Sequence, residues 1–254
     1  MFRTSNPMLR ESSFERTEPV VMGEEMTIDG TVTKAAFLLV LTAGVAAWPW
    51  TLFFESASAD FPNGNPGVVT PHLWIGLIGG LIMAIATCFK PNWSAYTAPL
   101  YAGLEGLFLG AISGYFEASY PDIAIQAVGL TLGVAFAMFL GYRSGLLKAT
   151  PAFRRGVMAA TGGIALVYLA TLVLGMFGVS IPLIHGSGLM GIGFSLFVVG
   201  IAALNLVLDF DLIEKGAEAG APKYMEWYGA FSLLVTLIWL YIELLRLLSK
   251  LRSR

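Results

Sequence analysis

The chain has 254 residues, of which 56% are hydrophobic and 13% charged, and its net charge is −2. A soluble domain carries about 25% charged residues, so this composition indicates an integral membrane protein. The small net charge excludes a nucleic-acid-binding protein, which would need a clustered basic face. The single cysteine, Cys88, lies in an apolar stretch and lacks a partner for a disulfide or a CxxC metal site, so we interpret it as a packing residue.

Residues 1–30 are polar, with arginine, glutamate and aspartate throughout, and they contain no apolar run that could act as a signal sequence. We expect a flexible cytoplasmic tail here. Residues 31–254 are expected to form one membrane domain, because the connections between their apolar stretches are too short to fold separately.

Seven stretches with few or no charges follow the tail. A helix needs roughly 20 apolar residues to cross a hydrocarbon core of about 30 Å, and each stretch is long enough or nearly so. The sequence therefore predicts an all-α integral membrane protein with seven transmembrane helices. The stretches are Ala35–Phe54, Leu73–Phe89, Ala95–Phe116, Ile123–Tyr142, Val157–Phe177, Gly188–Leu208 and Trp227–Leu248.

Lysine and arginine predict the orientation, because positive residues are retained on the cytoplasmic side. The tail and alternate loops carry these residues, whereas the opposite loops, around Asp60, Glu117 and His185, contain none. We therefore expect a cytoplasmic N-terminus. The last segment is an exception, since a seventh crossing places Arg246, Lys250, Arg252 and Arg254 outside, and the side of the C-terminus stays open.

The third segment contains Gly106, Gly110 and Gly114 at four-residue spacing, which is typical of close helix packing in membranes. Glu105 lies in the same segment, about 15 Å into the helix. An ionised carboxylate facing lipid is costly, so we expect Glu105 to face the bundle interior, to be protonated or to have a partner. A neutral, hydrogen-bonded structural role is the alternative to a functional one.

The sixth segment ends with Asn205 and Asp209 one turn apart on the same helix face. Asp209 is expected at the cytoplasmic end, where Arg143 of the fourth segment lies at similar depth and could form an ion pair with it. In the seventh segment, Glu243 follows sixteen uncharged residues and precedes Arg246 by three positions. Glu243 is therefore either in an intrahelical ion pair or part of a pore or proton site.

The outer loops carry acidic residues without lysine or arginine, which would raise the local concentration of cations. Interior carboxylates could then act as oxygen ligands or as proton-titrated gates for a cation such as Ca²⁺. No cofactor is expected, and whether any residue binds a metal is left open.

Three segments resemble the Bax inhibitor-1 family, in its bacterial YccA-like branch. They are Ala98–Ser113, Leu208–Gly216 and Leu240–Arg246, and their order and spacing extend the resemblance over nearly the whole chain. The resemblance implies a seven-helix fold whose last helix is central and wrapped by the other six. It also implies a location in the bacterial inner membrane.

Similar proteins are described as pH-sensitive calcium leak channels gated by acidic residues on the sixth and seventh helices. Asp209 matches the sixth-helix acid, whereas Glu243 matches the seventh only by local pattern and lies further along the chain than the family's second acid. Glu243 would then be about 15 Å deeper than Asp209, so a direct pair is doubtful and Glu105 could couple to Glu243 instead. If two carboxylates do approach, deprotonation adds repulsion and favours opening.

The alternative function is a non-conducting regulatory protein, because the YccA-like branch is known for restraining a membrane-bound quality-control protease and its relatives are tied to stress survival. The polar tail would then be the contact element. An enzyme is not expected: the sequence has neither GxSxG nor HExxH, and Asp209 has no second aspartate at matching depth in the seventh segment.

Overall fold

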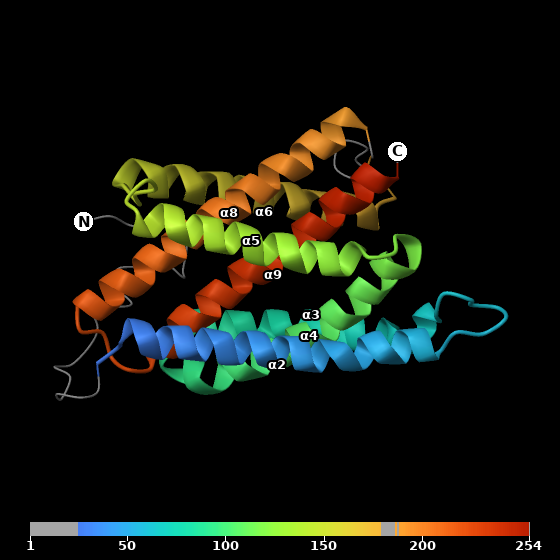
Figure 1. The fold of residues 1–254 in the computed structure, drawn as a ribbon, viewed down its shortest axis with the longest axis horizontal. Helices are drawn as coiled ribbons and strands as arrows, with labels where there is room; N and C mark the ends of the chain where they lie inside the picture. Colours follow the sequence, from blue (N-terminus) through green and yellow to red (C-terminus); the bar gives the residue numbers. More distant parts are fainter. Residues whose placement is uncertain (1–24, 179–185, 187, 254) are drawn as a thin grey trace. The chain divides into compact units, whose positions relative to one another are not determined.

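A computed structural model describes residues 25–178, 186 and 188–253, and this part of the chain contains seven α-helices and one short 3₁₀ helix (Figure 1). All seven predicted segments are confirmed as helices. Six of the seven are long and apolar enough to cross a membrane, and α4 is the one outside that set. The helices are α2 (Ile28–Glu55), α3 (Pro66–Phe89), η2 (Pro91–Trp93), α4 (Ser94–Ser119), α5 (Ile123–Arg143), α6 (Pro151–Met176), α8 (Leu189–Glu218) and α9 (Met225–Arg252).

Polar side chains set several helix starts, because they accept hydrogen bonds from backbone N–H groups that have no partner within the helix. Thr27 caps α2 by accepting from the N–H of Gly30, and Thr150 caps α6 by accepting from Phe153. The cap at Thr27 explains why α2 begins within the range assigned to the polar tail. The rest of the tail, residues 1–24, lies outside the described residues.

The chain divides into two compact units. The first comprises Met1–Pro121 and Asp211–Val235, and the second comprises Asp122–Phe210 and Thr236–Arg254. Helices α8 and α9 therefore contribute residues to both units, whereas α2, α3 and α4 belong to the first and α5 and α6 to the second.

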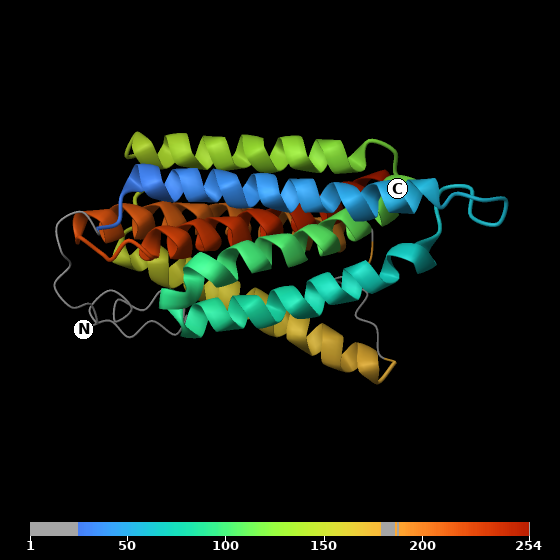
Figure 2. The ribbon, with the colours of Figure 1, turned by 90° about the horizontal axis from the view of Figure 1, so that it is seen from below.

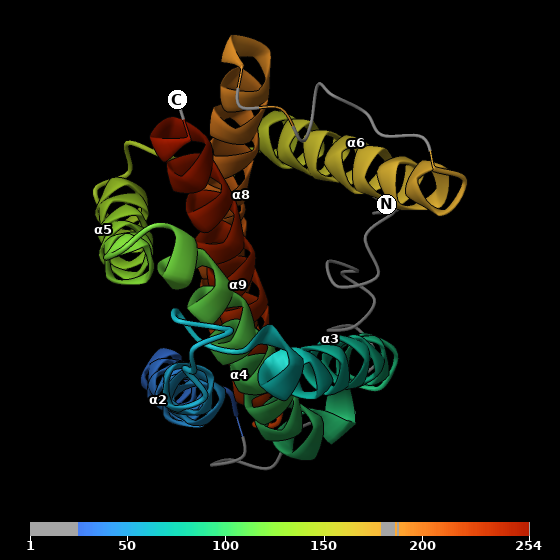
Figure 3. The ribbon, with the colours of Figure 1, turned by 90° about the vertical axis from the view of Figure 1, so that its right-hand side faces the viewer.

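In the first unit α4 lies between α2 and α3 (Figures 2 and 3). Glycines allow this close packing: a Cβ atom at Gly106 would lie 2.7 Å from the carbonyl oxygen of Thr42 in α2. At Gly76 of α3, a Cβ atom would lie 2.5 Å from the carbonyl oxygen of Leu104. Gly110 and Gly114 also face α2, where a Cβ atom would meet the backbone of Ala46 and the ring of Phe53 respectively, so the small residues of α4 let the helices approach closely.

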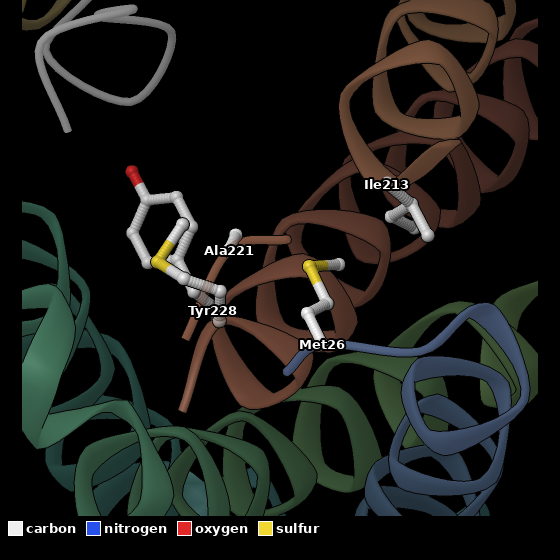
Figure 4. Close-up of a cluster of buried hydrophobic side chains, with 5 residues drawn as sticks. Met26, Ile213, Ala221 and Tyr228 are labelled. Carbon is white, nitrogen blue, oxygen red and sulfur yellow. The ribbon is translucent and has the colours of Figure 1, made fainter. Parts of the chain in front are cut away.

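The first unit also joins the start of α2 to the connection between α8 and α9. Glu25 and Pro222 form an isolated antiparallel bridge, and the N–H of Met26 donates to the carbonyl of Ala221 at 2.6 Å. A buried apolar cluster lies beside this bridge (Figure 4). Its members are Met26, Ile213, Ala221, Met225 and Tyr228.

In the second unit α8 and α9 lie side by side, with α5 and α6 on opposite sides of them (Figures 2 and 3). Phe210 of α8 contacts two aromatic rings of α5, those of Phe139 at 5.6 Å and Tyr142 at 6.0 Å between centroids. Polar contacts, described next, join α6 and the end of α9.

Candidate functional site

Glu243 is the centre of a buried charged cluster on α9. Its residue is 1% exposed, and its carboxylate accepts three hydrogen bonds. The Tyr168 hydroxyl of α6 donates to Oε1 at 2.8 Å, and Nη1 of Arg246 donates to Oε1 and Oε2 at 2.9 and 3.1 Å. The ion pair considered from the sequence is therefore present, and a tyrosine from another helix completes it.

Tyr168 joins both charged groups. Arg246 Nη1 donates to the Tyr168 hydroxyl at 2.6 Å, and its guanidinium carbon lies 5.1 Å from the centroid of the Tyr168 ring. The ring of Phe194 in α8 meets the Tyr168 ring edge-on at 6.2 Å. The hydroxyl thus accepts from a cation and donates to a carboxylate, so both of its hydrogen bonds are charge-assisted.

Two further basic residues near the end of α9 also bind within the second unit. Lys250, 6% exposed, donates to the carbonyl of Gly191 at 3.1 Å and to the Ser195 hydroxyl at 2.8 Å. Arg252 donates to Gln126 of α5 at 2.8 Å.

Asp209 is buried in α8, 5% exposed, and Asn205 one turn earlier reaches α6. The amide of Asn205 donates to the Thr161 hydroxyl at 2.8 Å and to the carbonyl of Ile201 at 2.8 Å. Arg143 lies in the last turn of α5. Its pairing with Asp209 stays a prediction.

Glu105 belongs to the first unit. Its carboxylate accepts a hydrogen bond from the Tyr101 hydroxyl one turn earlier in α4 and lies against Gly80 of α3. A Cβ atom at Gly80 would come within 2.6 Å of Oε1 of Glu105, so a larger residue there would require the Glu105 side chain to shift. Glu105 therefore faces α3, and its coupling to Glu243 stays a prediction.

Glu226, which lies in the first turn of α9 and is 1% exposed, was not among the residues selected from the sequence. The N–H and hydroxyl of Thr27 donate to its Oε1 at 3.0 and 2.8 Å, and Lys34 forms an ion pair with Oε2. This carboxylate fixes the start of α2 against the start of α9. Tyr168 was also missed, although a hydroxyl in the middle of an apolar segment is a signal that could have found it.

Within the described ranges, no group of three or more His, Cys, Asp or Glu side chains is arranged to hold a metal ion. Two carboxylates of the spans have other partners: Glu243 bonds Arg246 and Tyr168, and Glu105 bonds Tyr101.

These features define a multi-pass α-helical membrane protein with buried charged side chains in its last helix. The chain matches the family described as Bax inhibitor 1 like over residues 6–253, and it therefore belongs to that family. Members of this family are membrane proteins and not enzymes. Neither a comparison with curated proteins nor one with solved structures gave a significant match.

Proposed function

We propose that the protein is a proton-regulated cation leak, with Ca²⁺ as the favoured ion, in the YccA-like branch of its family. The observation that carries the proposal is the Glu243 carboxylate, buried within a span and held by Arg246 and Tyr168. Ionisable side chains within membrane spans are costly, and they commonly mark ion or proton pathways.

The same proposal places all seven helices across a bacterial inner membrane, with the N-terminus cytoplasmic and α9 at the centre of the bundle. The burial of α9 supports its central position, since none of its residues from Met225 to Lys250 is exposed. A helix surrounded by other helices can carry Glu243, Arg246 and Lys250 with little exposure of charge to hydrocarbon.

Two other carboxylates are candidates for the pathway. Asp209 is buried in α8, and Glu105 lies against α3 with its hydrogen bond from Tyr101. Each could bind a passing cation through carboxylate oxygen, which is the ligand that Ca²⁺ prefers. Their contributions are separable, because each can be replaced by its neutral amide with little change in size.

The test is calcium uptake by liposomes that contain the purified protein, with empty liposomes as the control. We expect uptake that depends on pH and changes in at least one of the variants Glu243→Gln, Asp209→Asn and Glu105→Gln. No uptake above that of empty liposomes at any pH would contradict the leak.

A regulatory protein that binds a membrane-bound quality-control protease or a stress-response partner is the second candidate. Its support is the contact of Glu25 and Thr27 with Pro222 and Glu226, which connects the end of the polar tail to α9. Deleting residues 2–24 keeps these contacts while removing the tail. If the form without residues 2–24 no longer binds the protease but still takes up calcium, partner binding is assigned to the tail. If neither the full chain nor this form takes up calcium, the leak is rejected and the regulatory function is the one that stays.

A further inference from the structure

Helix α6 contacts the rest of the second unit through a narrow stripe of side chains. Between Gly162 and Gly175 every residue is exposed except Ile164, Tyr168 and Thr171, which recur at about one per turn. Apolar packing between helices scales with the contact area, so a stripe this narrow holds α6 weakly.

Polar side chains provide the specific contacts of that stripe. The Thr161 hydroxyl accepts a hydrogen bond from Asn205 of α8, and the Tyr168 hydroxyl bonds both Glu243 and Arg246 of α9. The Thr171 hydroxyl, one turn later, bonds the carbonyl of Val167 in its own helix. In a low-dielectric surrounding the charge-assisted contacts at Tyr168 are the strongest of these.

We propose that α6 is a movable gate helix and that the Tyr168 hydroxyl, bonded to Glu243 and Arg246, is the latch that holds it against α9. Displacement of α6 would uncover the side of α9 that carries Glu243. This inference rests on the proposed cation leak and names the helix whose movement regulates it.

Protonation of Glu243 is the event that would release the latch. The groups that face this carboxylate are Tyr168 from α6 and Arg246 from α9, with Lys250 of α9 in electrostatic range, and α8 adds the ring of Phe194 beside Tyr168. A neutral Glu243 loses its ion pair with Arg246 and accepts more weakly from Tyr168. Acidification therefore opens the gate, which is the opposite of the sign expected for two repelling carboxylates.

The distance between α6 and α9 can be measured directly by double electron–electron resonance in nanodiscs. Spin labels would be attached at Leu172→Cys on α6 and Leu251→Cys on α9, positions that are 64% and 48% exposed, in a Cys88→Ser background. Tyr168→Phe removes the latch hydroxyl and keeps the ring. Thr171→Val is the matched control, because it removes a hydroxyl that bonds within α6 itself.

We expect a narrow distance distribution at high pH and a second, longer population at low pH. Tyr168→Phe removes both hydrogen bonds of the hydroxyl, to Glu243 and from Arg246, and should increase the displaced population about 10-fold or more at high pH. Glu243→Gln should show the displaced population at both pH values, and Thr171→Val should match the parent protein.

The latch is overturned if the distributions of Tyr168→Phe and Glu243→Gln superimpose on that of the parent at both pH values. Calcium uptake by the same preparations separates this failure from that of the leak. Displacement of α6 without uptake would keep the latch and reject the leak. A pH-dependent uptake with an unchanged α6–α9 distance would keep the leak and reject the latch.

Discussion

Helices α6 and α9 are both long and apolar enough to cross a membrane, yet their surroundings differ completely. In α9 no residue from Met225 to Lys250 is exposed, whereas in α6 almost every residue from Gly162 to Gly175 is. The second half of α9 carries four charged side chains, Glu243, Arg246, Lys250 and Arg252, and Tyr168 of α6 bonds the first two. The comparison teaches that hydropathy predicts which segments cross, while the placement of polar side chains indicates which segment is surrounded by protein.

The largest effect should follow from removing the carboxylate of α9. Glu243→Ala leaves Arg246 without its ion pair, and we expect a loss of about 2–3 kcal/mol in the free energy of unfolding. This is less than for a fully buried pair, because the Arg246 side chain is 34% exposed. Thermal unfolding in mild detergent would measure it.

The double variant Glu243→Ala/Arg246→Leu provides the control for that measurement. Because it removes the cation as well, it should be more stable than Glu243→Ala alone. The contrary result is a loss of unfolding free energy in the double variant that equals the sum of the losses in Glu243→Ala and Arg246→Leu. The contact between the two side chains then contributes nothing to stability, and the interpretation of the cluster is wrong.

Glycines of the two helices should respond differently to a larger side chain. At Gly229 of α9 a Cβ atom would lie 3.0 Å from Cγ1 of Ile213 and 3.1 Å from Cγ2 of Thr31, whereas none of the surrounding atoms lies within 4 Å of a Cβ at Gly163 of α6. Gly229→Leu should therefore cost about 2 kcal/mol through overpacking. Gly163→Leu should not destabilise the protein and should stabilise it by up to about 0.8 kcal/mol, because leucine favours a helix more than glycine does. Equal shifts in the thermal midpoint would show that the difference in burial has no energetic consequence.

A smaller effect is expected where α9 meets α8. Ser195→Ala removes one acceptor of the buried Lys250 ammonium group and should cost about 1 kcal/mol. Thr171→Val on α6 is the comparison, since its hydroxyl bonds within its own helix, and it should stay within about 0.5 kcal/mol of the parent. If Ser195→Ala is as stable as Thr171→Val, the hydrogen bond between Lys250 and Ser195 does not stabilise the contact between α9 and α8.

The sequence predicted all seven helical segments, because long apolar stretches bounded by proline, glycine and charges leave few other structures. It predicted the start of α2 less well, since Thr27 and the buried Met26 lie in a stretch that composition alone marks as polar tail. Hydropathy has no information about a cap or a single buried methionine within such a stretch.

The partners of the candidate site were beyond prediction for a different reason. Arg246 lies three positions from Glu243 on one helix, so spacing revealed their contact, but Tyr168 is 75 positions away and lies on another helix. Glu226 and Lys34 are 192 positions apart. A helix that is apolar around its whole circumference gives no sequence signal for which face meets which neighbour.

Calcium uptake as a function of pH, in liposomes with the parent protein or Glu243→Gln, tests the central claim most directly. We predict uptake that rises as the pH is lowered for the parent, and high uptake at every pH for Glu243→Gln, because the amide, like a protonated carboxyl, cannot form the ion pair with Arg246. A Glu243→Gln profile identical to that of the parent, or no uptake by either protein, would contradict the claim that Glu243 is the proton-regulated gate of a cation leak.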